Sequence, residues 1–141
     1  MTEQDKPLLY TSYFARLRRI DLTKFYDFSI CASPPKFYCG LNFITLAPSR
    51  ELVMAYKYQT GMSEEQYEQE YRRSTLGHLY QGEIIDRIFN VIPPKKTPVM
   101  LCYEKVGDFC HRHILARWFT EGGYPCREMP EELLLPKGGG A

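Results

Sequence analysis

The feature that most constrains the fold is a short apolar run in the last third of the chain, residues 99–103 (Val-Met-Leu-Cys-Tyr). Apolar residues at every position, rather than at alternate ones, are typical of a central parallel strand with both faces covered. A short loop follows, and then a helix is predicted over residues 109–120, with Asp108 as its N-cap and Gly122 beyond its end. Residues 124–129 are predicted to form a last short strand. This strand–helix–strand unit predicts a right-handed parallel crossover, and hence a three-layer Rossmann-like α/β domain with a small, mostly parallel sheet.

Earlier segments supply the other elements of such a domain. Residues 8–14 and 25–31 are rich in aromatic and apolar residues, which predicts two more strands. The sequence Ser-Glu-Glu-Gln at residues 63–66 matches a capping box, in which the first and last residues cap each other's backbone, so a helix is expected to begin there. Further helices are predicted over residues 50–58 and 83–89.

Length, charge and cysteine content limit the class of protein. A chain of 141 residues is typical of one domain, predicted here as residues 1–135 followed by a flexible tail at residues 136–141. With 18 basic and 17 acidic residues the net charge is +1, which argues against nucleic acid and an anionic membrane as partners. No apolar run approaches the ~20 residues of a membrane helix, and the first residues lack the pattern of a signal peptide, so a cytoplasmic location is expected. The 5 cysteines, an odd number without a C-x-x-C pair, are expected to be reduced thiols.

The loop after the central strand concentrates the residues that carry chemistry. Ligands of open parallel sheets bind at the carboxyl ends of the strands, and Glu104, Cys110 and His111 are predicted as catalytic residues at that edge. The helix N-terminus offers free N–H groups and a partial positive charge, which favour an anion there, including the thiolate of Cys110. Lys105 and Arg112 are predicted to bind an anionic ligand at the same place. Alternatively, Glu104 and Arg112 form a structural ion pair.

Three residues from other elements complete the predicted ligand site. Tyr10 and Ser12 lie on the first predicted strand, and Tyr71 lies on the helix that begins near residue 63. An aromatic ring with a hydroxyl group can stack on a ligand and also hydrogen-bond to it. Structural alternatives stay open, since Tyr71 and Tyr67 can both be core residues and Cys110 can be a small buried hydrophobe.

Residues 102–112, Cys-Tyr-Glu-Lys-Val-Gly-Asp-Phe-Cys-His-Arg, resemble the signature of the domain-of-unknown-function 488 family. Members of that family carry a strand, a Glu, a short turn and then Cys-His-Arg at the start of a helix. Residues 10–12, 33–37 and 46–49 are similar to the short branch of the family. The resemblance implies a Rossmann-like α/β domain with a polar pocket around the Glu and Cys-His-Arg, and it implies no particular activity. Residues 28–30 (Phe-Ser-Ile) stand where the longer branch has Asp-x-Arg, so no role of that pair carries over.

Several functions agree with these features. The first is binding, with or without turnover, of a nucleotide-like or phosphorylated small ligand such as a signalling nucleotide. The alternative is a cysteine- or glutamate-dependent hydrolase or transferase. Zinc at Cys102, Cys110, His111 and His113 is disfavoured because Cys102 is expected to point into the core, so neither a metal nor another cofactor is predicted. A further alternative is a nucleic-acid or protein-binding module that uses the basic residues 16–19, and a homo-oligomer stays open.

Overall fold

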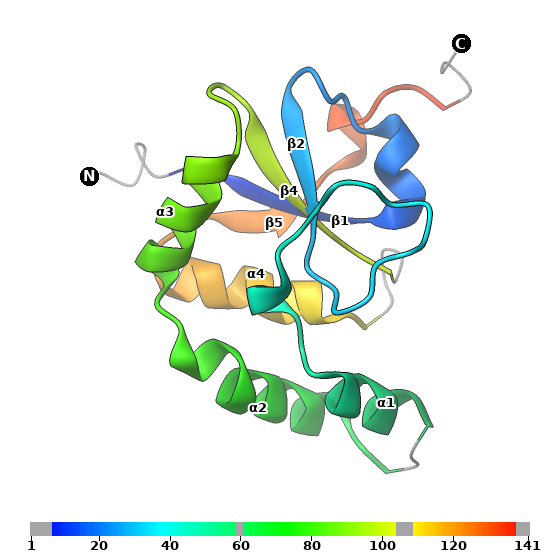
Figure 1. The fold of residues 1–141 in the computed structure, drawn as a ribbon, viewed down its shortest axis with the longest axis vertical. Helices are drawn as coiled ribbons and strands as arrows, with labels where there is room; N and C mark the ends of the chain where they lie inside the picture. The colour runs from blue at the N-terminus through cyan, green and yellow to red at the C-terminus, as the bar shows by residue number, and fades with distance from the viewer. Residues whose placement is uncertain (1–6, 59–60, 104–108, 138–141) are drawn as a thin grey trace.

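The structure, a computed structural model, describes residues 7–58, 61–103 and 109–137 (Figure 1). It contains a five-stranded sheet in the order β3-β2-β4-β1-β5, and every strand pair in it is parallel. The strands are β1 (Leu9–Tyr13), β2 (Phe25–Ser29), β3 (Leu41–Asn42), β4 (Thr97–Cys102) and β5 (Cys126–Glu128). The α-helices are α1 (Arg50–Tyr58), α2 (Glu64–Ser74), α3 (Gln81–Val91) and α4 (His111–Glu121). Short 3-10 helices are η2 (Phe14–Arg19), η3 (Ile44–Leu46), η4 (Leu76–His78) and η5 (Glu131–Leu133).

Strand β4 is the central strand that the apolar run predicted. It pairs with β2 on one side and with β1 on the other, and residues 98–102 are all buried. The register with β1 aligns Ser12 with Leu101 and Tyr13 with Cys102, so the members of each pair point to the same face of the sheet. The predicted Rossmann-like α/β class is therefore confirmed, with a sheet that is parallel throughout.

The helices are distributed unevenly over the two faces. Figure 1 shows α3 and α4 on one side of the sheet, with α1 and α2 beyond α4, and η2 together with the C-terminal segment on the other side. Helix α4 covers the face that carries Cys102, because Arg112 of α4 donates a hydrogen bond to the sulfur of that residue. The layers on both sides explain why β4, the central strand, carries an unbroken apolar run.

The order of the strands creates a crevice at one position along the sheet. After β2 the chain moves outward to β3, whereas after β4 it crosses over β1 through α4 and reaches β5. The two connections leave neighbouring strands in opposite directions, which is the arrangement known as a topological switch point. Such a fold leaves room for a ligand at the carboxyl ends of β2 and β4.

The sequence predicted the start of α2 correctly and the start of α4 only approximately. The capping box is present as predicted, with the Ser63 side chain accepting from the Gln66 backbone and the Gln66 side chain accepting from the Ser63 backbone. Helix α4 instead begins at His111, two residues later than expected, because Cys110 has an extended backbone (φ −152°, ψ 147°) and takes the N-cap position. The expected cap, Asp108, lies outside the described residues.

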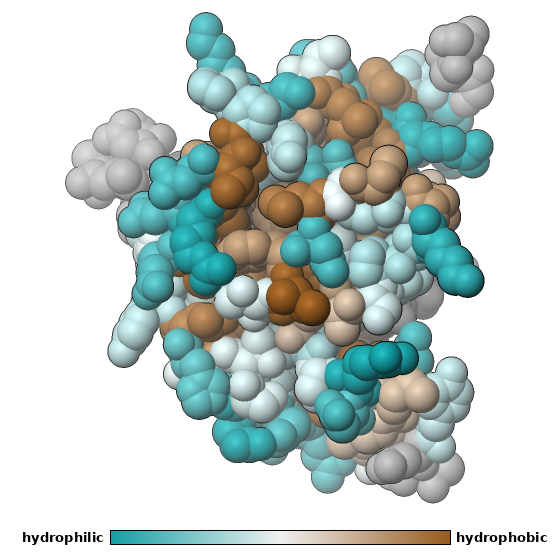
Figure 2. Space-filling view, viewed as in Figure 1, coloured by the Kyte–Doolittle hydropathy of each residue, from teal (hydrophilic) through white to brown (hydrophobic). Residues whose placement is uncertain are grey.

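Two surface observations complete the description. Among the described residues, no helix has the length and hydropathy needed to cross a lipid bilayer. Figure 2 shows apolar side chains near the middle of one face, over α3 and the segment before α1, with polar side chains around them. Exposed Ile44 and Val91 belong to those two segments. Oligomer formation stays a prediction.

Candidate functional site

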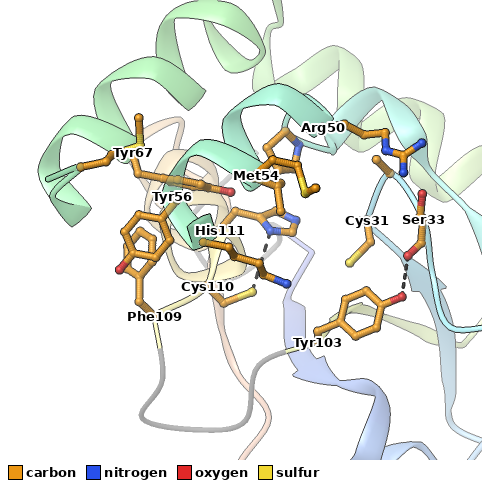
Figure 3. Close-up of a pocket in the computed structure, with 15 residues that line it drawn as sticks. Cys31, Ser33, Arg50, Met54, Tyr56, Tyr67, Tyr103, Phe109, Cys110 and His111 are labelled. Atoms are coloured by element: carbon orange, nitrogen blue, oxygen red, sulfur yellow. Dashed lines mark hydrogen bonds between the residues drawn. The ribbon is translucent and has the colours of Figure 1, made fainter. Parts of the chain in front are cut away.

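A cavity of ≈ 800 Å³ lies at the switch point between β2 and β4 (Figure 3). Its walls come from the segments that follow these two strands, from the first residues of α4 and from helix α1. The main lining residues are Cys31, Ser33, Arg50, Met54, Tyr56, Lys57, Tyr67, Tyr103, Phe109, Cys110 and His111. The volume is within the range of about 300–1,000 Å³ that is usual for small-molecule sites.

Cys110 and His111 are the predicted catalytic residues that the structure places at this cavity. Both are buried, with exposed fractions of 3% and 7%, and both contribute to its wall. Nε2 of His111 lies 2.8 Å from the carbonyl oxygen of Ile30, and because a carbonyl only accepts, Nε2 carries the proton. Nδ1 is then the unprotonated nitrogen, and it lies 3.8 Å from Sγ of Cys110. The free lone pair of the imidazole therefore faces the sulfur.

The surroundings of His111 keep it neutral. Burial lowers its pKa to about 4, an effect that the hydrogen bond to Ile30 opposes and that the positive charge of Arg112 assists. The ring of Tyr71 packs edge-on against the imidazole at 5.6 Å, and the Tyr71 hydroxyl donates to the carbonyl oxygen of Leu46 at 2.6 Å. Tyr71, a predicted ligand-binding residue, is fully buried and does not line the cavity. It fixes the position of His111 from behind.

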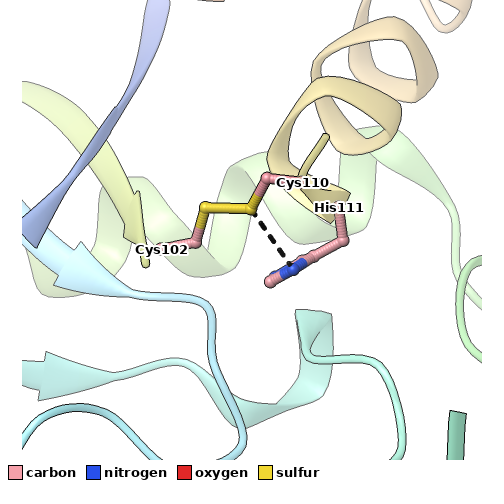
Figure 4. Close-up of side chains that lie close together, drawn as sticks. All are labelled: Cys102, Cys110 and His111. Atoms are coloured by element: carbon pink, nitrogen blue, oxygen red, sulfur yellow. Dashed lines mark hydrogen bonds between the residues drawn. A yellow bond between two sulfur atoms is a disulfide. The ribbon is translucent and has the colours of Figure 1, made fainter. Parts of the chain in front are cut away.

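A disulfide joins Cys102, the last residue of β4, to Cys110, the N-cap of α4 (Figure 4). The expectation that all cysteines are reduced is therefore wrong for this pair, while Cys39 and Cys126 are outside any disulfide. Cys102 lies in the core as expected, but it also faces the N-terminus of α4, because α4 packs on the face of β4 that carries this side chain. The sequence offered no C-x-x-C signal, since the two cysteines are 8 positions apart.

The disulfide and His111 also form the candidate metal-binding cluster among the described residues. Atoms of Cys102, Cys110 and His111 that could bind a metal all lie within 4.8 Å of one another. Two thiolates and an imidazole are a usual donor set for zinc. In the disulfide, however, neither sulfur is the thiolate that zinc requires, so this state of the protein offers only the imidazole.

Arg112 does not line the cavity, contrary to the prediction that it binds the ligand there. It is completely buried, and its Nε and NH2 donate to the two carboxylate oxygens of Glu128 at 2.9 and 3.1 Å. A third donor, NH1, reaches Sγ of Cys102 at 3.0 Å, and the guanidinium lies 5.5 Å from the ring centre of Tyr13. A cation near a helix N-terminus requires an anionic partner, and Glu128 of the same chain is that partner.

Tyr10 and Ser12, also predicted as ligand-binding, lie on β1 away from the cavity lining. The ring of Tyr10 packs against Phe25 at 6.0 Å and under the guanidinium of Arg127 at 5.6 Å. Ser12 is fully buried on the sheet face opposite Cys102, and its hydroxyl has no hydrogen-bond partner among the residues that the structure describes.

Two further predicted site residues, the catalytic Glu104 and the ligand-binding Lys105, lie outside the described residues.

Sequence reasoning missed the wall that α1 contributes. Tyr56 of α1, Tyr67 of α2 and Phe109 before α4 form an aromatic cluster whose ring centres lie 5.1 to 5.3 Å apart. Arg50 and Lys57 are exposed residues of α1 at the same cavity. A basic and aromatic helix is visible in the sequence, but its position depends on the irregular segment that follows β2, for which the sequence carries no periodic signal.

Comparison with known proteins identifies the family of the chain. Residues 38–123 match the family described as DUF488-N3a, the active DUF488-N3 subclade. The matched stretch is more than half of the chain and includes α1, β4, Cys110 and His111. No curated protein matches the chain, and no solved structure matches it either. The chain belongs to the DUF488 family, in its DUF488-N3a subclade.

Proposed function

We propose that the cavity at the switch point binds a nucleotide-like or phosphorylated small ligand, and that Cys110 in its reduced form reacts with it. The observation that carries the proposal is the combination, in one cavity, of an aromatic cluster, two cationic side chains and a helix N-terminus. The aromatic cluster suits the base of a nucleotide, and the other two features suit its phosphate.

The aromatic cluster suits a base or another flat ring. Tyr56 and Phe109 are half-buried, and each lies against Tyr67, so the side chains hold one another in place around the cavity. Stacking on aromatic side chains is worth about 1–3 kcal/mol per base and tolerates different bases.

The basic groups suit the phosphate end of the ligand. Arg50 and Lys57 lie one below the other on α1 at a spacing of two helical turns, so both side chains reach the same cavity. The first N–H groups of α4 add fixed partial positive charge beside Cys110. Arg16 and Arg19, part of the basic stretch that suggested a nucleic-acid module, form ion pairs with Glu131, so we do not propose that partner.

Turnover is the second part of the proposal. Once the disulfide is reduced, Nδ1 of His111 can accept the hydrogen bond of the Cys110 thiol and pass its proton on to a leaving group, because its lone pair faces the sulfur and an imidazole with a pKa of about 4 does not hold the proton. The helix N-terminus favours the resulting thiolate. Glu104 remains a predicted acid or base. The word "active" in the description of the subclade agrees with catalysis, and a cytoplasmic location, where thiols are kept reduced, agrees with the reactive form.

Thermal-shift measurement on the reduced protein tests the binding. A ligand at a hundred times its Kd should stabilise the native state by about 2.7 kcal/mol. Tyr56→Leu should weaken the shift, whereas Tyr58→Leu, which changes an exposed tyrosine of the same helix, should leave it unchanged. Absence of any shift across a broad panel of nucleotides and sugar phosphates would reject the proposal.

Charge gives a second matched pair of variants. Arg50→Gln combined with Lys57→Gln should weaken binding of phosphorylated ligands and leave their unphosphorylated forms little affected, because only the anion contacts are lost. Arg18→Gln, on an exposed residue of η2, removes a positive charge elsewhere and serves as the control. Equal effects of the double variant and the control would contradict the assigned phosphate position.

A further inference from the structure

We infer that Cys102 and Cys110 are a reactive dithiol pair, in which Cys110 attacks a small disulfide in the cavity and Cys102 resolves the mixed disulfide. This activity goes beyond the proposed function, since it requires no nucleotide. The disulfide in the structure is the product state of the pair. The inference rests on two observations: the unequal positions of the two sulfurs, one at the cavity and one buried behind it, and the groups that stabilise their thiolates.

The positions of the two cysteines assign their roles. Cys110 lines the cavity, so a small molecule there meets its sulfur first. Cys102 is completely buried at the end of β4, does not line the cavity and is bonded to the sulfur of Cys110. An incoming disulfide can therefore exchange with Cys110. Cys102 can react only afterwards, with the sulfur of Cys110 in the mixed disulfide.

Both sulfurs have groups beside them that stabilise a thiolate. Sγ of Cys102 accepts a hydrogen bond from NH1 of Arg112, and the guanidinium is held in place by Glu128. Sγ of Cys110 lies at the N-cap of α4, where the first N–H groups of the helix favour an anion. Thiolates are the nucleophiles in thiol–disulfide exchange, and a positively charged neighbour or a helix N-terminus favours them.

The reaction consists of two exchanges. First, the sulfur of Cys110 attacks R–S–S–R, the substrate S–S bond breaks, and the thiol proton of Cys110 passes through Nδ1 of His111 to the leaving R–S⁻. Second, the thiolate of Cys102 attacks the Cys110 sulfur, the bond between that sulfur and the retained S–R group breaks, and the second R–S⁻ takes up the proton that Cys102 gave up. In sum, one substrate disulfide is reduced to two thiols, and the two cysteines are oxidised to the disulfide. A dithiol reductant, itself oxidised to a disulfide, returns the pair to its starting state.

The other cysteines differ from the pair in ways that permit a clean experiment. Cys31 also lines the cavity, but its Sγ is 4.0 Å from the carbonyl oxygen of Leu101, which accepts the thiol hydrogen. Burial raises the pKa of Cys126 to about 12, so that thiol stays protonated and unreactive. Cys39 is exposed and is replaced by Ser in every protein used for the test.

For the test, the full chain is reduced with dithiothreitol, the dithiothreitol is removed, and bis(2-hydroxyethyl) disulfide, a small neutral probe, is added. Intact mass and peptide mapping identify the products. The Cys39→Ser protein should end with the 102–110 disulfide, two hydrogen masses lighter and without a retained adduct. Cys102→Ser should instead retain one mixed disulfide at Cys110. Cys110→Ser should leave Cys102 unmodified over the same period.

The opposite results would overturn the inference. These are an adduct at Cys31 in place of Cys110, modification of Cys102 in the absence of Cys110, or a reduced protein that does not close the 102–110 bond. The last readout needs no variant at the buried position, so it remains decisive if Cys102→Ser does not fold. Nucleotide-induced thermal shifts are measured on the same reduced protein: exchange without shifts rejects the proposed function alone, and shifts without exchange reject the dithiol alone.

Discussion

The buried imidazole of His111 makes the stability of the protein depend on pH in a predictable direction. Its pKa falls from 6.5 in the unfolded chain to about 4 in the native state because burial penalises the charged form. Between these values the unfolded chain takes up a proton and the native state does not. Proton binding therefore stabilises the unfolded state relative to the native state as the pH falls, and the free energy of unfolding decreases.

The size of the effect follows from the two pKa values. At pH 7 both states are essentially neutral at this residue, and at pH 5 the unfolded chain is protonated while the native state is not. Each pKa unit is worth 1.36 kcal/mol, so moving from pH 7 to pH 5 should remove about 2 kcal/mol of stability through His111 alone. The carboxylates of Glu70, Glu121 and Glu131, whose pKa values are lowered by arginine partners, stay ionised in this interval and contribute little.

Urea unfolding at the two pH values provides the measurement. His111→Gln retains an N–H that can donate to the carbonyl oxygen of Ile30 but removes the titration, so its stability should fall by about 2 kcal/mol less than that of the wild type. His78→Gln, on an exposed histidine of η4, should keep the full decrease. Equal decreases in the wild type and His111→Gln would refute the neutral, buried imidazole, and with it the assignment of Nδ1 as the unprotonated nitrogen.

Two further predictions concern the contacts around the site, each with a matched control. Glu128→Gln should destabilise the protein by about 2 kcal/mol in urea unfolding, because a charge-assisted bond to buried Arg112 is lost. The control Glu131→Gln, at an exposed ion pair, should cost less than about 1 kcal/mol. Tyr71→Phe should lower the free energy of unfolding by about 1–2 kcal/mol, because a buried carbonyl loses its donor. The control Tyr80→Phe, at an exposed ring, should not change the melting temperature. Equal effects of the two variants would contradict the assigned hydrogen bond.

The parts of the fold that the sequence predicted are those set by local chemistry. The apolar run at residues 99–103 identified the central strand because a strand covered on both faces has no polar side. The capping box at residues 63–66 located the start of α2 because both of its hydrogen bonds lie within four residues. The edge strand Leu41–Asn42 was missed because two residues, one of them an exposed leucine, form no recognisable pattern.

The candidate site was predicted only in part, for geometric reasons. Cys110 and His111 were placed correctly at the carboxyl edge of the sheet. Arg112 was expected beside them, but successive residues of a helix project about 100° apart, so one helix start cannot direct His111 and Arg112 into the same cavity. The α1 wall and the pairing with Cys102 depend on contacts between distant segments, which no local pattern encodes.

Helix α1 is the helical wall of the cavity that buries the fewest residues. Among its nine residues only Leu52 is buried, fewer than α2, α3 or α4 bury. The ring of Tyr56, which packs against Tyr67 and Phe109, adds the contacts on the cavity side. A ligand that touches Tyr56 would add to these few contacts, so we expect binding to stabilise α1 more than β4 and the start of α4, which are already well buried.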